Sequence, residues 1–436
     1  MRYIKESLFL LILCVFLPTS TLAIGLLRDA DIEYSLDQVA KPILQAAGLS
    51  PSRIKVLVVD DTKMNAFVID NNHIFLTAGL ILKTKSPEML QSVIAHEAAH
   101  IANGHITRRL QNLRASRTAA GFGMAFAIAA GISSGSGDLA TGLAIGLNSS
   151  AKRVFLSHSR SEEASADQSA YKYMRRAGVD TRGMKNTLEL FEGQLNLTKQ
   201  RQDPYIQSHP LSRDRLRAVN SLINSDTSTV PQNPALYWHA RAVGKLSAFI
   251  RSPDWTLQRA DKSIAQDIKF MRKAVALSRQ GKITQAMQQM DQAQRLRPKD
   301  PFLMDLRAEL LMRARQFQAS AQTYAKAASL APASPLILAG QGRALLASGN
   351  PKSAQRALEK ARSRDFKNVR LHQDLAVAYA KLGNNGMASL VTAERYALQG
   401  KLKDAKLHAT RAQGLLQRGT PAWQRAQDVL SAARTK

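Results

Sequence analysis

The stretch "VIAHEAAHIANGH" (residues 93–105) contains residues whose types and spacing suit a metal-dependent hydrolase. On a helix, His96 and His100 lie about 40° apart in azimuth, so both imidazoles can bind one Zn²⁺. Glu97 is rotated by about 100° from His96, which keeps its carboxylate off the metal but near the water that the metal would activate. The pattern predicts a zinc site with Glu97 as general base, although H-E-x-x-H is short enough to arise by chance.

The third protein ligand must come from elsewhere in the chain. The metzincin pattern would need glycine at position 103 and histidine at position 106, where this sequence has Asn103 and Ile106, so His105 is not that ligand. Thermolysin-like zincins instead take a glutamate from a second helix. A ligand of this kind would be an acidic residue with a partner acid on the same helical face.

The stretch "SHSRSEEASADQSAYKYM" (residues 157–174) supplies this pair. Glu163 and Asp167 are four residues apart, so Glu163 can bind the metal while Asp167 accepts a hydrogen bond from a liganding histidine and fixes its tautomer. Glu162 is the competing ligand, but it has no acid four residues later. His158 is expected to be exposed to solvent.

Two kinds of element must position these side chains. The metal helix is expected to begin near Ser86-Pro87, because the apolar residues that follow recur at helical spacing. Upstream, "RIKVLVVDD" predicts one strand, and "NAFVIDNNHIFLTAGLIL" predicts two more, joined by a tight turn at Asp70 to His73. His73 is expected to be a turn residue.

One of these strands is a candidate for binding substrate. An edge strand beside a metal helix can pair with an extended peptide, and an ordinary core hairpin is the alternative. The candidate substrate strand consists of Asn65, Ala66, Phe67 and Val68.

The N-terminal residues predict an exported protein. A basic start, an apolar run from Leu8 to Leu17 and the small-residue end "TSTLA" predict a signal peptide over residues 1–23, with a membrane anchor or buried helix as the alternative. Cys14, the only cysteine, lies inside this segment, so the mature chain has no thiolate for catalysis or for zinc. The apolar residues 118–150 are expected to form a helical hairpin; a lid, or a surface for membrane or substrate, is the alternative.

The excess of positive charge is concentrated in the C-terminal half of the chain. Residues 231–436 contain 35 Lys and Arg against 13 Asp and Glu, which gives +22 of the total net charge of +28. Because aromatic residues are not interleaved with the basic ones, nucleic acid is not an expected partner. Anionic lipid headgroups and acidic peptides remain candidates.

The same half repeats with a period of 34 residues. Gly281, Gly349 and Gly383 fall on this period, with Arg315 in the missing glycine position, and small residues follow each by five positions. This resembles the tetratricopeptide repeat, a pair of antiparallel helices, with an ordinary helical bundle as the alternative. The register fails at Gly400, which predicts a divergent repeat or a capping helix at the end.

Three motifs together carry a family resemblance. "HEAAHIANGH", Ser159-Arg160 followed by E-x-x-x-D, and "SHPLSRDR" (residues 208–215) resemble, in this order, the signatures of the M48 peptidases, the HtpX-like gluzincins. With a signal peptide before them and repeats behind, the resemblance is to the periplasmic, BepA-like branch. Ala99 stands where the family often has glycine. The resemblance implies a zinc endopeptidase with His96, His100 and Glu163 as ligands.

The resemblance also draws attention to "SHPLSRDR". Pro210 restricts His209 to an extended backbone on a loop. His209 is expected either to donate a hydrogen bond to the oxyanion or to bind the zinc itself and hold the enzyme inactive. Arg215 is expected either to support the metal ligands from behind or to stabilise the oxyanion that forms during hydrolysis.

The expected fold class is α+β, mostly α, with a zincin-type metalloprotease domain that contains a small β-sheet, followed by an all-α tetratricopeptide-repeat solenoid. The expected parts are a signal peptide, a metalloprotease domain, a linker helix region and the repeats, over residues 1–23, 24–230, 231–263 and 264–436.

The resemblance implies a periplasmic protease that acts on unfolded or misassembled outer-membrane proteins and contacts their assembly machinery through the repeats, with an anionic membrane surface as a further candidate partner. The alternative is a latent protease, or a non-proteolytic chaperone or adaptor that acts through the repeats.

Overall fold

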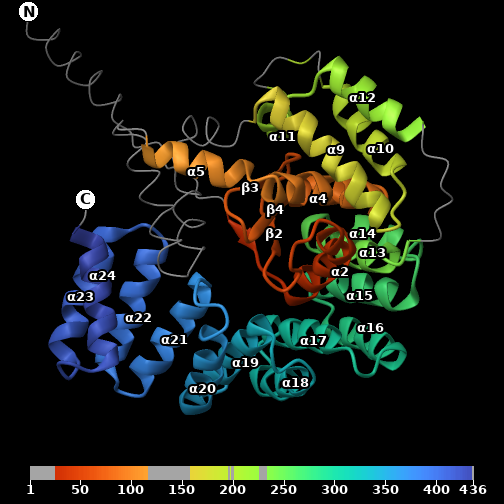
Figure 1. The fold of residues 1–436 in the computed structure, drawn as a ribbon. Coiled ribbons are helices and arrows are strands. Elements are labelled where there is room, and N and C mark those ends of the chain that lie inside the picture. The colour runs from red at the N-terminus through yellow and green to blue at the C-terminus, as the bar shows by residue number, and fades with distance from the viewer. Residues whose placement is uncertain (1–24, 116–157, 195–196, 198–200, 225–232, 435–436) are drawn as a thin grey trace, which may run out of the picture.

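The structure is a computed structural model that describes residues 25–115, 158–194, 197, 201–224 and 233–434 (Figure 1). The predicted signal peptide and the apolar residues 118–150 lie outside this part of the chain. Among the described residues, none of the helices combines the length and apolar character that crossing a bilayer requires.

The first half of the chain builds a small sheet and the helices around it. Its elements are β1 (Leu26–Leu27), α2 (Ala30–Ala46), β2 (Lys55–Val59), β3 (Ala66–Val68), β4 (His73–Thr77), α3 (Ala78–Lys83), α4 (Pro87–Ala102), α5 (His105–Ala115), α9 (Arg160–Arg176), α10 (Arg182–Glu192), α11 (Pro204–Ser208) and α12 (Arg213–Asn224).

The second half is entirely helical. Its elements are α13 (Leu236–Ile250), α14 (Pro253–Ala260), α15 (Gln266–Arg279), α16 (Ile283–Leu296), α17 (Pro301–Arg313), α18 (Phe317–Leu330), α19 (Pro335–Ala347), α20 (Pro351–Arg362), α21 (Val369–Lys381), α22 (Asn385–Leu398), α23 (Leu402–Leu415) and α24 (Pro421–Arg434). The expected fold class, α+β and mostly α with a helical-repeat half, is confirmed.

The sheet has the strand order β1-β2-β4-β3, so β3 is an edge strand. β2 and β4 run parallel, with Lys55 opposite His73, and β3 pairs antiparallel with β4. The three strands expected from the sequence are confirmed, and β1 is an additional short strand. Among the described residues β3 therefore lies at one side of the sheet, where it contacts α4.

Two details of the strand prediction are wrong. His73 is the first residue of β4 and is buried, because its ring nitrogen Nδ1 bonds the Asp70 carboxylate at 2.8 Å and its backbone pairs with β2. The residues after Thr77 form α3 instead of continuing the strand. Thr77 caps this helix, and its hydroxyl accepts a hydrogen bond from Leu80 N–H.

α4 begins where the sequence predicts. The Ser86 hydroxyl accepts a hydrogen bond from Met89 N–H, and Pro87 occupies the first turn, where its missing N–H costs nothing. The helix packs between the sheet and the helices α9 and α10, so even its polar residues from Gln91 to His100 are buried. The helix ends at Ala102, and Asn103 is its C-cap residue. Gly104 then adopts a left-handed φ of 71° and turns the chain sharply into α5.

The helical half has the 34-residue period expected from the sequence. α17, α19 and α21 begin 34 residues apart, as do α16, α18, α20 and α22. The turn glycines adopt the left-handed φ that glycine favours, for example 79° at Gly281 and 82° at Gly349. Arg315, which replaces a glycine of this series, adopts a φ of 60° and is the only non-glycine residue with positive φ among those described.

The two halves are joined through buried charges. Arg241 on α13 binds Asp31 of α2 at 2.6 Å and Asp300 before α17 at 2.5 Å, and its side chain is 1% exposed. Lys245, one turn further along α13, is fully buried and binds Asp29 at 2.9 Å. α13 also contributes apolar residues to the core beneath the sheet.

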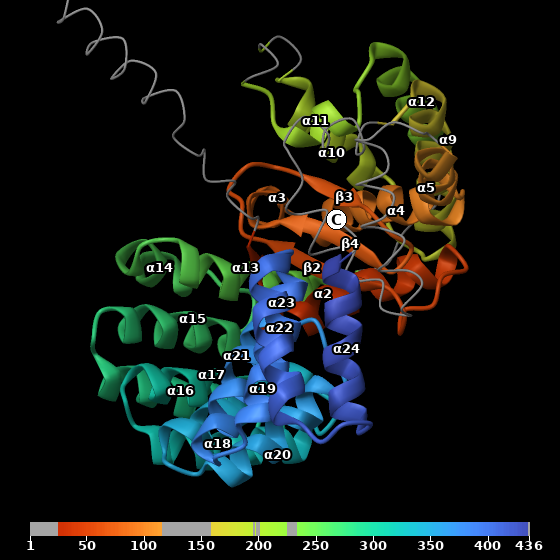
Figure 2. The ribbon, with the colours of Figure 1, turned by 90° about the vertical axis from the view of Figure 1, so that its left-hand side faces the viewer.

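The repeat helices form an arc beneath the sheet-containing half and curve back towards it (Figures 1 and 2). At the far part of this arc, Asp365 between α20 and α21 binds Arg28, just before α2, at 3.0 Å. Nearer its start, Ala30 packs against Phe302 of α17. The N-terminal end of α2 therefore contacts the repeats at two separate places.

Candidate metal centre

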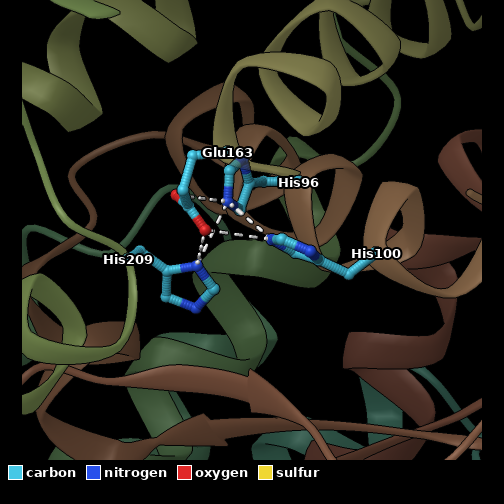
Figure 3. A group of neighbouring side chains, drawn as sticks. All are labelled: His96, His100, Glu163 and His209. Carbon is cyan, nitrogen blue, oxygen red and sulfur yellow. Dashed lines mark hydrogen bonds and ion pairs between the residues drawn. The ribbon is translucent and has the colours of Figure 1, made fainter. Parts of the chain in front are cut away.

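The two histidines of α4 and one glutamate of α9 converge in a buried cluster (Figure 3). His96 Nε2 and His100 Nε2 are 3.1 Å apart, and the Glu163 carboxylate lies 3.4 Å from each of them. Ligand atoms about 2.0–2.1 Å from a tetrahedral metal ion are about 3.3 Å from one another. The three donor groups therefore have the mutual spacing of a tetrahedral site.

The local structure of α9 explains why Glu163 faces this cluster and Glu162 does not. Ser159 and Glu162 form a capping box, in which the Ser159 hydroxyl accepts from Glu162 N–H and the Glu162 carboxylate accepts from Ser159 N–H. Glu162 therefore stays at the start of the helix. Glu163, one residue later, points inward and is fully buried.

Asp167 and Arg215 support this cluster from behind. Asp167 lies 3.0 Å from His96 Nδ1, one helical turn beyond Glu163, as its spacing in the sequence suggests. Arg215 donates two hydrogen bonds to Asp167, at 2.8 and 2.9 Å, and contacts Glu163 at 2.6 Å. Its guanidinium also bonds the Pro210 carbonyl. Arg215 is thus engaged with site carboxylates and backbone.

The charges of these groups shift one another's pKa. Burial alone would raise the pKa of Asp167, but the hydrogen bond from His96 and the charge of Arg215 lower it. Burial would likewise lower the pKa of His96, yet the Glu163 and Asp167 carboxylates raise it to about 10. For His100 burial prevails and lowers the pKa. The two histidines of α4 therefore differ in their surroundings.

Glu97 lies beside the cluster without being part of it. Its carboxylate is fully buried and has no hydrogen-bond partner among the described residues; the His209 ring lies close by, with Nε2 3.3 Å from Oε1. Burial raises the pKa of Glu97. A buried carboxylate without a hydrogen bond is costly and needs a functional reason, and accepting a proton from water is one.

His209 reaches the same cluster from the loop after α11. Its Nδ1 lies 3.0 Å from Glu163 Oε1 and 3.3 Å from His96 Nε2. The loop position that Pro210 suggests is confirmed, since α11 ends at Ser208. With His209, four buried groups offer ligand atoms that all lie within 4.8 Å of one another.

Three residues around the site were not foreseen from the sequence. His158 is buried, contrary to the expectation of solvent exposure, because its ring stacks on His100 with centroids 3.7 Å apart. His105 bonds His100, with the two Nδ1 atoms 2.8 Å apart. Tyr205 packs its ring against His209. These contacts depend on how α4, α5, α9 and α11 pack, and no spacing in the sequence encodes them.

The candidate substrate strand overlaps the edge strand β3. Asn65 precedes β3, and Ala66, Phe67 and Val68 form it. Next to it, Met64 N–H donates to the Asp203 carboxylate at 3.0 Å and the Met64 carbonyl accepts from Tyr205 N–H. The segment that carries His209 therefore lies against one end of the sheet edge.

The chain is similar to known metalloproteases. Residues 28–223 match the model of peptidase family M48. The beta-barrel assembly-enhancing protease of Escherichia coli (strain K12) is 21% identical over 391 residues, covering 87% of this chain and 78% of that protein. Metalloprotease LoiP of the same strain is 28% identical over 205 residues, covering 46% of this chain and 75% of that protein.

Two further similarities cover smaller shares of this chain. The mitochondrial metalloendopeptidase OMA1 of Schizosaccharomyces pombe is 28% identical over 187 residues, covering 42% of this chain and 51% of that protein. Among solved structures, MamA of Desulfovibrio magneticus RS-1 is 16% identical, with a TM-score of 0.33, and the match covers 38% of this chain and 96% of that one.

Proposed function

We propose that this metalloendopeptidase, whose residues 28–223 match peptidase family M48, is a zinc enzyme with His96, His100 and Glu163 as ligands and Glu97 as base. The observation that carries the proposal is the spacing of 3.1–3.4 Å among the three ligand groups. Two imidazoles and a carboxylate are a donor set that zinc accepts in catalytic sites.

The residues of the chain divide the chemistry among them. Zinc, when bound, supplies a Lewis acid that polarises the scissile carbonyl and lowers the pKa of water. Glu97 accepts a proton as a water oxygen bonds to the carbonyl carbon, and it returns a proton to the leaving nitrogen as the C–N bond breaks. Asp167 fixes the orientation of His96, and Arg215 fixes Asp167.

We assign substrate binding to β3. Among the described residues β3 is the last strand at its side of the sheet, and an extended peptide that pairs with it would run past α4, with backbone hydrogen bonds holding it in register. The residues in contact would be Asn65, Ala66, Phe67 and Val68.

The proposed substrates are misfolded or unassembled proteins of the bacterial envelope, above all outer-membrane proteins. Two findings support this: the signal-like residues 1–23, and similarity over most of the chain to a protein named for enhancing beta-barrel assembly. The proposed location is the periplasm. The repeats would bind substrate or assembly machinery, and their excess positive charge suits an anionic membrane surface.

His209 is proposed to be a brake. Its Nδ1 lies 3.0 Å from Glu163 Oε1 and 3.3 Å from His96 Nε2, close to the about 3.3 Å expected between tetrahedral ligands, so this side chain suits the fourth position. While it stays there, water has no access to that position. The oxyanion role remains the alternative, because a loop residue can move when substrate enters.

A second candidate function is a non-proteolytic chaperone or adaptor that acts through the repeats. The buried Glu97 carboxylate, which has no hydrogen-bond partner among the described residues, argues against it, because a structural metal site has no use for a base there. A latent protease with His209 in place is compatible with every contact described above.

The test is metal analysis combined with cleavage of casein and of a denatured porin. Glu97→Gln should keep zinc and lose at least about 100-fold in rate, since a general base contributes about 10²–10⁴-fold. Glu163→Ala should lose zinc. Glu162→Gln, on the same helix, is the control and should keep both, because glutamine also suits a capping box. Cleavage by Glu97→Gln at the wild-type rate would refute the mechanism.

A further inference from the structure

The two histidines of α4 have different partners at the ring nitrogen that points away from the cluster. His96 Nδ1 faces the Asp167 carboxylate at 3.0 Å, and Asp167 is held in turn by Arg215. His100 Nδ1 faces another imidazole, that of His105, at 2.8 Å. Among the described residues the partner of His100 Nδ1 is therefore an imidazole nitrogen, whereas that of His96 Nδ1 is a carboxylate.

Metal binding would determine which atom of this pair donates. His100 Nε2 points to His96 and Glu163, so a metal would take the lone pair of that nitrogen. The remaining nitrogen of a neutral imidazole then carries the proton. His100 Nδ1–H must donate, and His105 Nδ1 must accept with its own proton on Nε2.

We propose that His105 is a positioning residue for the metal site: it accepts the Nδ1–H of His100 and thereby fixes the tautomer and ring orientation of that ligand. This inference rests on the proposed zinc site. In this arrangement His105 acts through His100 and is not itself a ligand of the metal.

The turn between α4 and α5 is built to keep His105 in this place. Gly104, with a φ of 71°, returns the chain so that the first residue of α5 lies over the last turn of α4. The Asn103 side chain donates to Ser165 and Ser169 of α9, at 3.1 and 3.2 Å. The turn is therefore fixed to the same helix that supplies Glu163.

His158 does not compete for this hydrogen bond. It lies face to face with His100, with ring centroids 3.7 Å apart, and its Nδ1 accepts from Arg109 at 2.8 Å. A neutral His158 therefore carries its proton on Nε2. This arrangement also argues against a second metal among His100, His105 and His158, because a metal there would compete with the Nδ1 proton of His100 and the guanidinium of Arg109.

Two variants of similar shape separate hydrogen bonding from filling of space. In His105→Asn the side-chain oxygen lies where Nδ1 of histidine lies and can accept the proton. His105→Leu has the same branched arrangement of heavy atoms as asparagine, with methyl groups in place of the amide oxygen and nitrogen, and so has no acceptor. Loss of such an outer partner weakens metal binding by about 10–100-fold. The dissociation constant for zinc is measured on the full-length protein by competition with a chromogenic chelator.

We expect His105→Leu to weaken zinc binding by about 10–100-fold and His105→Asn to stay within about threefold of the wild type. Equal affinity of wild type and His105→Leu, or equal weakening in both variants, would overturn the inference while leaving the zinc site intact. A wild-type protein that binds no zinc would instead overturn the proposed function.

A second measurement needs no variant to fold. In the zinc-loaded wild type with ¹⁵N-labelled histidine rings, NMR should detect a protected, hydrogen-bonded proton on Nδ1 of His100 and the proton of His105 on Nε2. A His105 ring that carries its proton on Nδ1 would overturn the inference.

Discussion

The buried charges between the two halves allow one prediction to be worked out in detail. Arg241→Met removes a guanidinium that is 1% exposed and keeps most of the packing of the side chain. Asp31, also 1% exposed in its side chain, then retains Lys245, at 3.6 Å, as its one ion-pair partner in the described part of the chain. Asp300 loses its hydrogen bonds to the same guanidinium.

Breaking a buried ion pair by removing one partner costs about 3–5 kcal/mol, because the other charge stays buried. Since Lys245 still neutralises part of the charge of Asp31, we expect a loss of about 3 kcal/mol in the free energy of unfolding. Arg217→Met is the matched control. Its pair with Asp214 is 79% and 85% exposed, and such pairs contribute about 0–1 kcal/mol.

The assay is urea unfolding followed by far-ultraviolet circular dichroism, with ΔΔG from the shift of the transition midpoint. Adding Asp31→Asn to Arg241→Met should cost less than the sum of the two single changes, because the same interaction is lost only once. A loss below about 1 kcal/mol in Arg241→Met would refute the argument that this ion network joins the halves.

Three shorter predictions follow from the site and the repeats. His209→Ala should raise basal casein cleavage if His209 is a brake; a lower rate with zinc still bound would favour the oxyanion role, and an unchanged rate would exclude both. In urea unfolding, Arg315→Gly should stabilise the protein by about 0.5–1 kcal/mol, because glycine adopts a left-handed φ without strain. Gly349→Ala should destabilise it by about 1 kcal/mol for the converse reason, and changes of the opposite sign would contradict this. Chelation of zinc should lower the thermal unfolding midpoint of the wild type, because a ligand at about 1,000 times its dissociation constant stabilises the folded protein by about 4 kcal/mol. The same treatment should leave the midpoint of Glu163→Ala unchanged, because that variant should bind no zinc.

Local sequence patterns were sufficient for the elements with strong periodicity. α4 could be predicted because a capping serine, a proline and an apolar face coincide at Ser86-Pro87. The 34-residue spacing predicted the repeats, and even located the position that Arg315 takes from glycine. The pair Glu163 and Asp167 could be found because four residues on a helix return to the same face.

What the sequence did not show depends on contacts between distant segments. His158 is buried because α9 packs its N-terminal end over His100, 58 positions earlier in the chain. His105 becomes a partner of His100 only because Gly104 allows a left-handed turn there. β1 escaped prediction because Leu26–Leu27 is two residues long and obtains its hydrogen bonds from β2.

The contacts of α2 with the second half also set an order in time for folding. Asp31 meets Arg241 across a sequence separation of 210 residues, and Arg28 meets Asp365 across 337. At a synthesis rate of about 5–20 residues per second, the first partner follows roughly 10–40 s after Asp31. During that interval Asp31, the most deeply buried carboxylate of α2, lacks its partner Arg241. The helix that supports the sheet therefore reaches its final packing late, after both Arg241 and Asp365 have been made.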